Sequence, residues 1–287
     1  MMQMPLKINA LTLPVLLLVA TLGLHQSEVT KAQDPIIVQS NICSVDNRAF
    51  KDGEQLTYKL YYNWNFVWLS AGEVTFNVSE LEDQYHLSAV GTTYKSYEWF
   101  FKVRDYYDSY VDKETLLPKV SIRDVEEGKY RLYDRVTFDQ DNGKAFSLRG
   151  KSQQTAEMSN YNIDRCMHDV LSMVYFLRNV DISSYRKGDS LPLKVFMDKE
   201  SWPLIMTYAG KEQGVKVKGM GRFNTLRVSP EVIEGDIFEE GTEMNVWVTD
   251  DENRVPLVIE SPLSVGSVKA VLKDYKNLRY DLSAAVK

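Results

Sequence analysis

Alternation of apolar and polar residues is the dominant pattern along this chain. Between residues 72 and 81, Val74, Phe76 and Val78 fall on one side, and polar residues separate them. Successive side chains of a β-strand point to opposite faces, so this pattern predicts a strand with one face against a core. Similar segments recur, and we expect about 14 strands. They are predicted over residues 55–63, 72–81, 85–93, 103–112, 118–127, 129–139, 145–148, 191–198, 204–208, 215–217, 221–228, 243–249, 255–260 and 268–275.

The turns between these segments favour antiparallel pairing. Asn142-Gly143 is a strong hairpin signal, because both residues readily adopt positive φ. A long antiparallel meander must curl or close, since an open sheet twists and leaves edges. We therefore predict a mostly all-β fold, a large curled antiparallel sheet forming a roll or half-barrel. It should be a single β-rich domain over 53–280, and two similar halves would divide near 180–188.

One segment has helical rather than strand spacing. Its apolar residues recur at i, i+3, i+4, i+7 and i+10, which predicts a single amphipathic helix. The stripe consists of Met167, Val170, Leu171, Val174 and Leu177. We expect this central helix to run from Arg165 to Asn179, with Asp164 as its N-cap.

The first 32 residues resemble an export signal. Lys7 precedes an apolar stretch over 11–24, and Thr30-Lys31-Ala32 offers the small residues expected before a cleavage site. We predict cleavage after Ala32 and a periplasmic or envelope-associated protein with no transmembrane segment in its mature chain. An uncleaved membrane anchor is the alternative. Residues 33–52 should follow as an irregular tail that contributes few apolar residues to the fold.

Composition and cysteine content narrow the chemistry. The 34 basic and 40 acidic residues give a net charge of −6, so no nucleic-acid partner is expected. An exported chain with two cysteines favours one disulfide, Cys43–Cys166, although two independent buried thiols would also fit. With only three histidines beside them, we expect no metal site and no cofactor.

Aromatic residues supply the candidate ligand-binding site. The segment from Tyr61 to Trp68 is the densest aromatic run, and a later strand adds more aromatic side chains. Such residues can line a binding groove, lie at a membrane interface or form buried core. The residues we assign to ligand binding are Tyr61, Tyr62, Trp64, Phe66, Trp68, Tyr106 and Tyr110.

No set of residues in the sequence has the spacing of a catalytic site. His168 and Ser172 would share a helix face, but Asp169 would point about 100° away, which favours a capping role over a nucleophilic triad. Asp105 and Asp108 are an odd number of residues apart, so a strand places them on opposite faces. Either carboxylate could still pair with one elsewhere in the chain. We therefore expect no catalytic residues.

Several short motifs, in order along residues 50–275, resemble an exported bacterial family catalogued as domain of unknown function 3108. The motifs are Gly53-Glu54-Gln55-Leu56-Thr57-Tyr58, Ala71-Gly72-Glu73, Arg104-Asp105, Tyr110-Val111-Asp112, Leu117-Pro118, Asp169-Val170-Leu171-Ser172, Leu177-Arg178, Trp247-Val248-Thr249-Asp250 and Arg254-Val255-Pro256. The cysteines and the aromatic segment are most similar to Bacteroidetes members. The family has no established activity, so the resemblance implies no catalytic residue.

A looser resemblance concerns the fold. A strand, a turn, Arg-x-Pro and a return strand are similar to the periplasmic lipoprotein-carrier superfamily, which implies a curled sheet that shields a hydrophobic ligand. We therefore predict a non-enzymatic cell-envelope protein that binds an apolar or amphipathic ligand, such as a lipid, on its concave face. The alternative is a structural module that docks an envelope protein partner. A glycan-acting enzyme is a third hypothesis.

Overall fold

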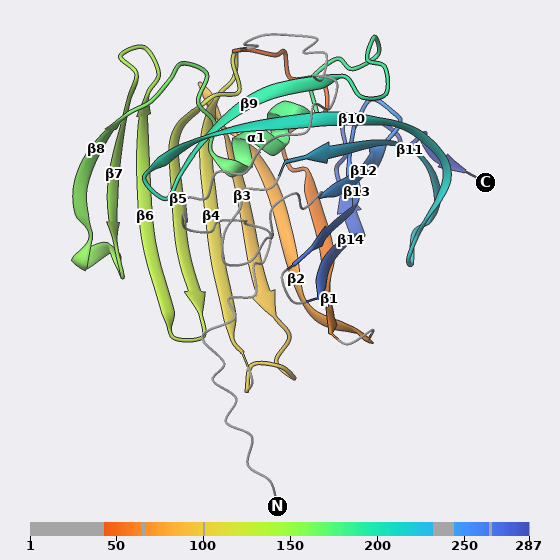
Figure 1. Ribbon diagram of the computed structural model, residues 1–287, viewed down its shortest axis with the longest axis horizontal. Helices are drawn as coiled ribbons and strands as arrows, with labels where there is room; N and C mark the ends of the chain where they lie inside the picture. The colour runs from red at the N-terminus through yellow and green to blue at the C-terminus, as the bar shows by residue number, and fades with distance from the viewer. Residues whose placement is uncertain (1–42, 65–66, 100, 232–243, 264–265, 287) are drawn as a thin grey trace, which may run out of the picture.

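Antiparallel pairing of neighbouring strands builds one large curled sheet (Figure 1). The computed structural model describes residues 43–64, 67–99, 101–231, 244–263 and 266–286. The strands are β1 (Gln55–Trp64), β2 (Val67–Glu80), β3 (Gln84–Thr93), β4 (Val103–Asp112), β5 (Pro118–Glu127), β6 (Tyr130–Asp139), β7 (Lys144–Gly150), β8 (Glu157–Asn162), β9 (Ser190–Met197), β10 (Glu200–Val217), β11 (Gly221–Pro230), β12 (Asn245–Thr249), β13 (Pro256–Pro262), β14 (Ser267–Lys276) and β15 (Ala285–Val286). The helices are α1 (Val170–Leu177) and a 3-10 turn, η1 (Gln153–Thr155).

The strand order shows how the chain returns on itself. From edge to edge it is β8-β7-β6-β5-β4-β3-β2-β1-β14-β13-β12-β11-β10-β9, and β15 pairs with β11. The late strands therefore join the early ones through β1 and β14. Within the described residues the edge strands β8 and β9 do not pair with each other, so the sheet curls without closing into a barrel. The predicted fold class, a curled antiparallel sheet with one central helix, is confirmed.

Several strands differ from the prediction: β2 begins at Val67, and the short strand β15 was not expected. The segments expected over 204–208 and 215–217 belong to one 18-residue strand, β10, whose register shifts twice against β11. Gly210 and Gly214 lie at these irregularities with positive φ, which a strand accommodates as a bulge. Strand β8 was not predicted, because its residues are almost all exposed and show no apolar alternation.

The core lies on the concave face of the sheet and extends into the N-terminal tail. Phe50 is fully buried, and its ring makes edge contacts with Tyr85 at 5.2 Å and Tyr175 at 5.0 Å between centroids. Ala49 beside it is buried too. The described part of the tail thus contributes few buried apolar residues, as expected, but these two positions anchor it to the helix and to β3.

Helix α1 is shorter than predicted and begins later. Its N-cap is Asp169, whose carboxylate accepts hydrogen bonds from the backbone N–H groups of Leu171 and Ser172. Asp164 instead pairs with Lys194 at 2.9 Å. The preceding residues do not join the helix, because the backbone of His168 exchanges hydrogen bonds with Lys194 and Phe196. Tertiary pairing thus removes the first predicted turn from the helix.

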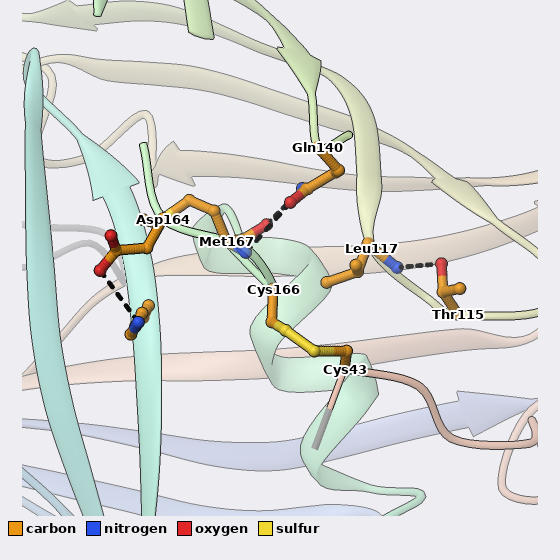
Figure 2. The surroundings of a disulfide bond; sticks show 8 residues. Cys43, Thr115, Leu117, Gln140, Asp164, Cys166 and Met167 are labelled. Atoms are coloured by element: carbon orange, nitrogen blue, oxygen red, sulfur yellow. Dashed lines mark hydrogen bonds and ion pairs between the residues drawn. A yellow bond between two sulfur atoms is a disulfide. The ribbon is translucent and has the colours of Figure 1, made fainter. Parts of the chain in front are cut away.

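The predicted disulfide between Cys43 and Cys166 is present, with Cα atoms 4.8 Å apart (Figure 2). Cys166 does not open the helix as expected but lies before it, at φ 63°. The next residue, Met167, exchanges two hydrogen bonds with the Gln140 side chain (Figure 2). The bond therefore holds the tail to a segment that also contacts the far end of β6.

Two predictions concern the ends of the chain and the division of the domain. The predicted leader, residues 1–32, lies outside the described residues. Among the helices of the described part, none has the length and apolar character needed to cross a membrane. The predicted division near 180–188 falls in the connection from α1 to β9 and stays a prediction.

Candidate functional site

An apolar cavity of about 230 Å³ lies between the concave face of the sheet and helix α1. In Figure 1, α1 sits inside the curl, with β9 and β10 passing over it and β3 and β4 behind it. Residues from the early strands line one part of the wall, including Leu60, Phe76 and Ala89. Residues from the late strands, including Val246 and Ala270, line another. The cavity therefore exists because the chain returns and pairs β14 with β1.

The sequence positions α1 over this cavity through its capping residues. Ser172 and Asp169 cap each other's backbone, which fixes where the helix starts. Asp169 also accepts a hydrogen bond of 2.5 Å from the hydroxyl of Ser109 on β4, and both groups are buried. The helix start is thus tied to the sheet, so that Val170 and Val174 line the cavity.

Charged side chains are rare on the described part of the cavity wall. They are Arg178, Glu231 and Arg254. Arg178 is buried and binds both oxygens of Glu54, at 2.5 and 2.9 Å. The rest of the wall is almost entirely aliphatic, which suits a hydrocarbon ligand more than a polar one.

None of the predicted ligand-binding residues lines this cavity within the part of the chain that is described. Tyr106 is 46% exposed on the face of β4 opposite its buried residues. Tyr110 lies on that same face, where its ring stacks on His86 at 4.5 Å. Both are therefore on the outer face and not on the predicted concave one. Tyr107, in the opposite phase of the same strand, lines the cavity instead.

The described aromatic side chains of the β1–β2 hairpin are likewise not among the residues that line the cavity. Tyr61 is partly buried against the edge of the main core, and its ring is 5.0 Å from Nζ of Lys218. Tyr62 is half-buried on β1, and burial raises its pKa. Trp68 is 39% exposed, with Lys269 over its ring at 4.8 Å. Phe66 and the side chain of Trp64 fall outside the described residues.

The wall residues share a sequence pattern that aromatic content does not reveal. Leu60, Val74, Phe76 and Ala89 all belong to the apolar phase of their strands. That phase identifies residues facing the interior, but alternation alone cannot separate a filled interior from one that contains a cavity. Aromatic density instead selected residues on the hairpin and on the outer face.

His168, Asp169 and Ser172, whose spacing argues against a catalytic triad, lie together in the buried N-terminal cap of α1. Nδ1 of His168 lies 3.3 Å from the hydroxyl of Ser172. The Asp169 carboxylate binds backbone N–H groups and Ser109, with no hydrogen bond to the His168 ring among the described contacts. Burial lowers the pKa of His168 to about 3, so its ring is neutral at physiological pH.

Asp105 and Asp108 lie on opposite faces of β4, as their spacing predicts. Asp108 is on the outer face, 2.7 Å from Nε2 of His86. Asp105 is buried on the inner face, diagonally across from Glu127 on β5. Burial raises the pKa of both Asp105 and Glu127, and the charge of Glu127 raises that of Asp105 further. Neither of these two is among the described residues lining the large cavity.

A charged network lies beside that pair, on the inner face of β5–β7. Arg123 and Arg149 each bind Asp134 on β6, at 2.9 and 2.6 Å. Both also bind Asp198, in the turn between β9 and β10, at 2.7 Å. The network therefore attaches the overlying β9–β10 hairpin to the early strands.

These features define a class of protein, a curled and open antiparallel sheet wrapped around one helix and an apolar cavity. The chain belongs to the family of proteins of unknown function DUF3108, whose model matches residues 57–273. The family resemblance in the sequence motifs is thereby confirmed.

Comparison with solved structures gives one match of similar fold and one of weaker similarity. A β-barrel-like protein of domain of unknown function DUF1849 from Brucella abortus is 9% identical, with a TM-score of 0.55, covering 82% of this chain and 99% of its own. A structure described as a "putative lipoprotein" from Parabacteroides distasonis is 13% identical, with a TM-score of 0.29, covering 81% and 99%. No curated protein matches the chain. The first of these similarities supports the fold.

Proposed function

We propose that this protein is an exported, non-enzymatic binding protein of the cell envelope, whose cavity holds an apolar or amphipathic ligand. The observation that carries the proposal is the cavity of about 230 Å³, with its nearly continuous aliphatic wall. Well-packed protein interiors contain few voids larger than a water molecule, and apolar cavities of this kind bind apolar molecules.

Two observations support the exported location. Cys43 and Cys166 form a disulfide, and disulfides persist mainly in oxidising compartments outside the cytosol. The first 32 residues have the pattern of a cleavable leader. N-terminal sequencing of the protein from its native envelope tests this part, and a mature chain starting near residue 33 is the expected result.

The binding role is supported by how the polar groups are used. His168, Asp169 and Ser172 are engaged in the buried cap of α1. Asp105 and Asp108 lie on opposite faces of β4. The cavity beside α1 is instead lined mainly by apolar residues, which favours binding over catalysis.

The test is ligand binding by the mature protein with the cavity open or filled. Wild-type protein should bind the neutral dye Nile red, with a blue-shifted emission, and should carry lipid detectable by mass spectrometry when purified from its envelope. Ala270→Phe adds a ring to the cavity wall, and Val174→Trp does so from the helix. Both should abolish binding while the circular dichroism spectrum is retained.

The matched control is Tyr106→Ser, which removes an aromatic ring from the outer face. It should bind like the wild type. Loss of binding in Tyr106→Ser with binding retained in Ala270→Phe would move the site to the outer aromatic residues. Absence of both dye binding and co-purified lipid in the wild type would reject the proposal and favour a protein-interaction role.

A further inference from the structure

Arg254 is a cation on the wall of the apolar cavity. It follows the turn after β12 and has φ 49°, a left-handed conformation that non-glycine residues seldom adopt. Within the described residues, its guanidinium makes no hydrogen bond and no ion pair. A guanidinium carries five N–H donors, so a wall group of this kind offers several bonds to a ligand.

The other two charges on the described wall are already engaged. Arg178 binds the Glu54 carboxylate and the carbonyl of Asn253. Glu231 accepts a hydrogen bond from the N–H of Ile205 at 3.1 Å. Arg254 therefore differs from both, because its guanidinium donors have no hydrogen-bond partner among the described residues.

The surroundings of Arg254 do not neutralise it. The exposed carboxylate of Asp181 is near enough to be affected: hydrogen bonds from Ser183 lower the pKa of Asp181, and the charges of Arg254 and Arg48 lower it further. Solvent screens such an exposed group strongly. The oxygen of Asp181 is instead bound to the backbone of Ser183, at 2.9 Å.

We propose that Arg254 binds the anionic head group of an amphipathic ligand whose hydrocarbon tail fills the cavity. The inference rests on the proposed function and adds the ligand class. The aliphatic wall supplies affinity through burial of the tail. A charge-assisted, two-pronged hydrogen bond from the guanidinium selects a carboxylate or phosphate head group and orients the molecule.

The experiment compares ligands that share one tail and differ in the head group. Dodecanoate, dodecyl phosphate and 1-dodecanol are titrated into the mature protein, and their affinities are read by displacement of Nile red. The wild type should bind at least one anion about tenfold or more tightly than the alcohol, as a charge-assisted bond predicts. Whether dodecanoate or dodecyl phosphate binds more tightly distinguishes a fatty acid from a lipid phosphate as the source.

Substitution of Arg254 tests whether this residue causes the tighter binding of the anions. Arg254→Gln should bind the anions no more tightly than the alcohol, with its affinity for 1-dodecanol unchanged within about twofold. If Arg254→Gln does not fold, Arg254→Asn is tested in its place, because Asn accepts a left-handed backbone. Arg48→Gln is the matched control, because it removes a cation near the same Asp181 without touching the cavity. It should retain the wild-type preference.

The outcomes separate the two proposals. Equal affinity of the wild type for the alcohol and both anions would overturn the role of Arg254 and leave the apolar site standing. An equal loss of all three ligands in Arg254→Gln or Arg254→Asn would also overturn it, since that is the effect of a damaged cavity. If the wild type binds none of the three ligands, the proposed function itself fails.

Discussion

Arg178 and Glu54 form a buried bidentate ion pair that joins the end of α1 to the residue before β1, 124 positions away. Arg178 also donates to the carbonyl oxygens of Ala49 and Asn253. One guanidinium thus connects the helix, the N-terminal tail and the turn after β12. Since all these groups are removed from water, the pair must be complete to be tolerated.

Breaking this pair should therefore be costly. Arg178→Met leaves the Glu54 carboxylate buried without its cation, and we expect a loss of about 3–5 kcal/mol in the free energy of unfolding, measured by urea denaturation. Arg48→Met is the control, because its pair with Asp46 is exposed. It should have almost no effect. Equal effects of the two substitutions would contradict this account of Arg178.

The disulfide should stabilise the whole domain and not the tail alone. Cys43→Ser is expected to lower the free energy of unfolding by about 2–5 kcal/mol, because the bond closes a long loop in the unfolded chain. The buried Phe50 links the tail to the core, so the loss should appear in the global transition. Cys166→Ser and the double variant should match Cys43→Ser. Two free thiols in denatured, unreduced native protein would refute the bond.

The buried carboxyl pair predicts a stability that falls as pH rises. Burial raises the pKa of Asp105 and of Glu127. In the unfolded chain both groups lose their protons near the ordinary carboxyl value of about 4. Above that pH the folded state holds more protons than the unfolded state, so stability decreases until the raised pKa values are passed.

Urea denaturation between pH 4.5 and 9 measures this slope, which is at most about 1.4 kcal/mol per pH unit for one proton. Asp105→Asn should flatten the profile, because it removes one member of the pair. Asp124→Asn is the matched control, an exposed aspartate on the outer face of β5. It should keep the wild-type slope, and a slope unchanged in Asp105→Asn would argue against the pair.

His168 should make the protein less stable as the pH falls, which is opposite to the effect of the Asp105–Glu127 pair. Burial lowers its pKa to about 3, while the unfolded chain titrates near 6.5. The unfolded state therefore binds more protons between these values, and stability falls as pH drops through that window. His168→Phe should reduce this acid sensitivity in the same denaturation series. An unaltered profile below pH 6 would count against a buried neutral ring.

The ion pairs of Asp198, in the β9–β10 turn, should stabilise the fold through the charge of its carboxylate. A substitution that removes this charge and leaves the backbone conformation unchanged tests this. Burial raises the pKa of Asp198, but the charges of Arg123 and Arg149 outweigh burial and hold the pKa below its usual value. Asp198→Asn removes that charge and still suits the left-handed φ of 52°. We expect a loss of about 1.5–3 kcal/mol, since charge-assisted hydrogen bonds are broken.

The control for Asp198 is its neighbour. Lys199 is exposed, and it too has a left-handed backbone, at φ 72°. Lys199→Asn should leave the free energy of unfolding almost unchanged. A similar loss in both variants would assign the effect to the turn and not to the ion pairs.

Local patterns in the sequence specify the secondary structure and the class of fold. Alternation on β2 and the Asn142-Gly143 turn depend on side chains that are close along the chain, so they predicted strands, hairpins and a curled sheet. The even cysteine count likewise predicted the bond between Cys43 and Cys166, because export and oxidation are properties of the whole chain. The family motifs were recognised in the same way.

Tertiary structure alone decided where the helix starts and where the cavity lies. Residues 165–168 have helical spacing, yet pairing of His168 with the strand at Val195 keeps them out of the helix. The cavity forms only because β14 pairs with β1, which brings Ala270 beside Leu60. Arg254 and Tyr107 became site residues for the same reason. Such contacts join residues far apart in the chain, and no local pattern encodes which interior positions will meet without filling the space between them.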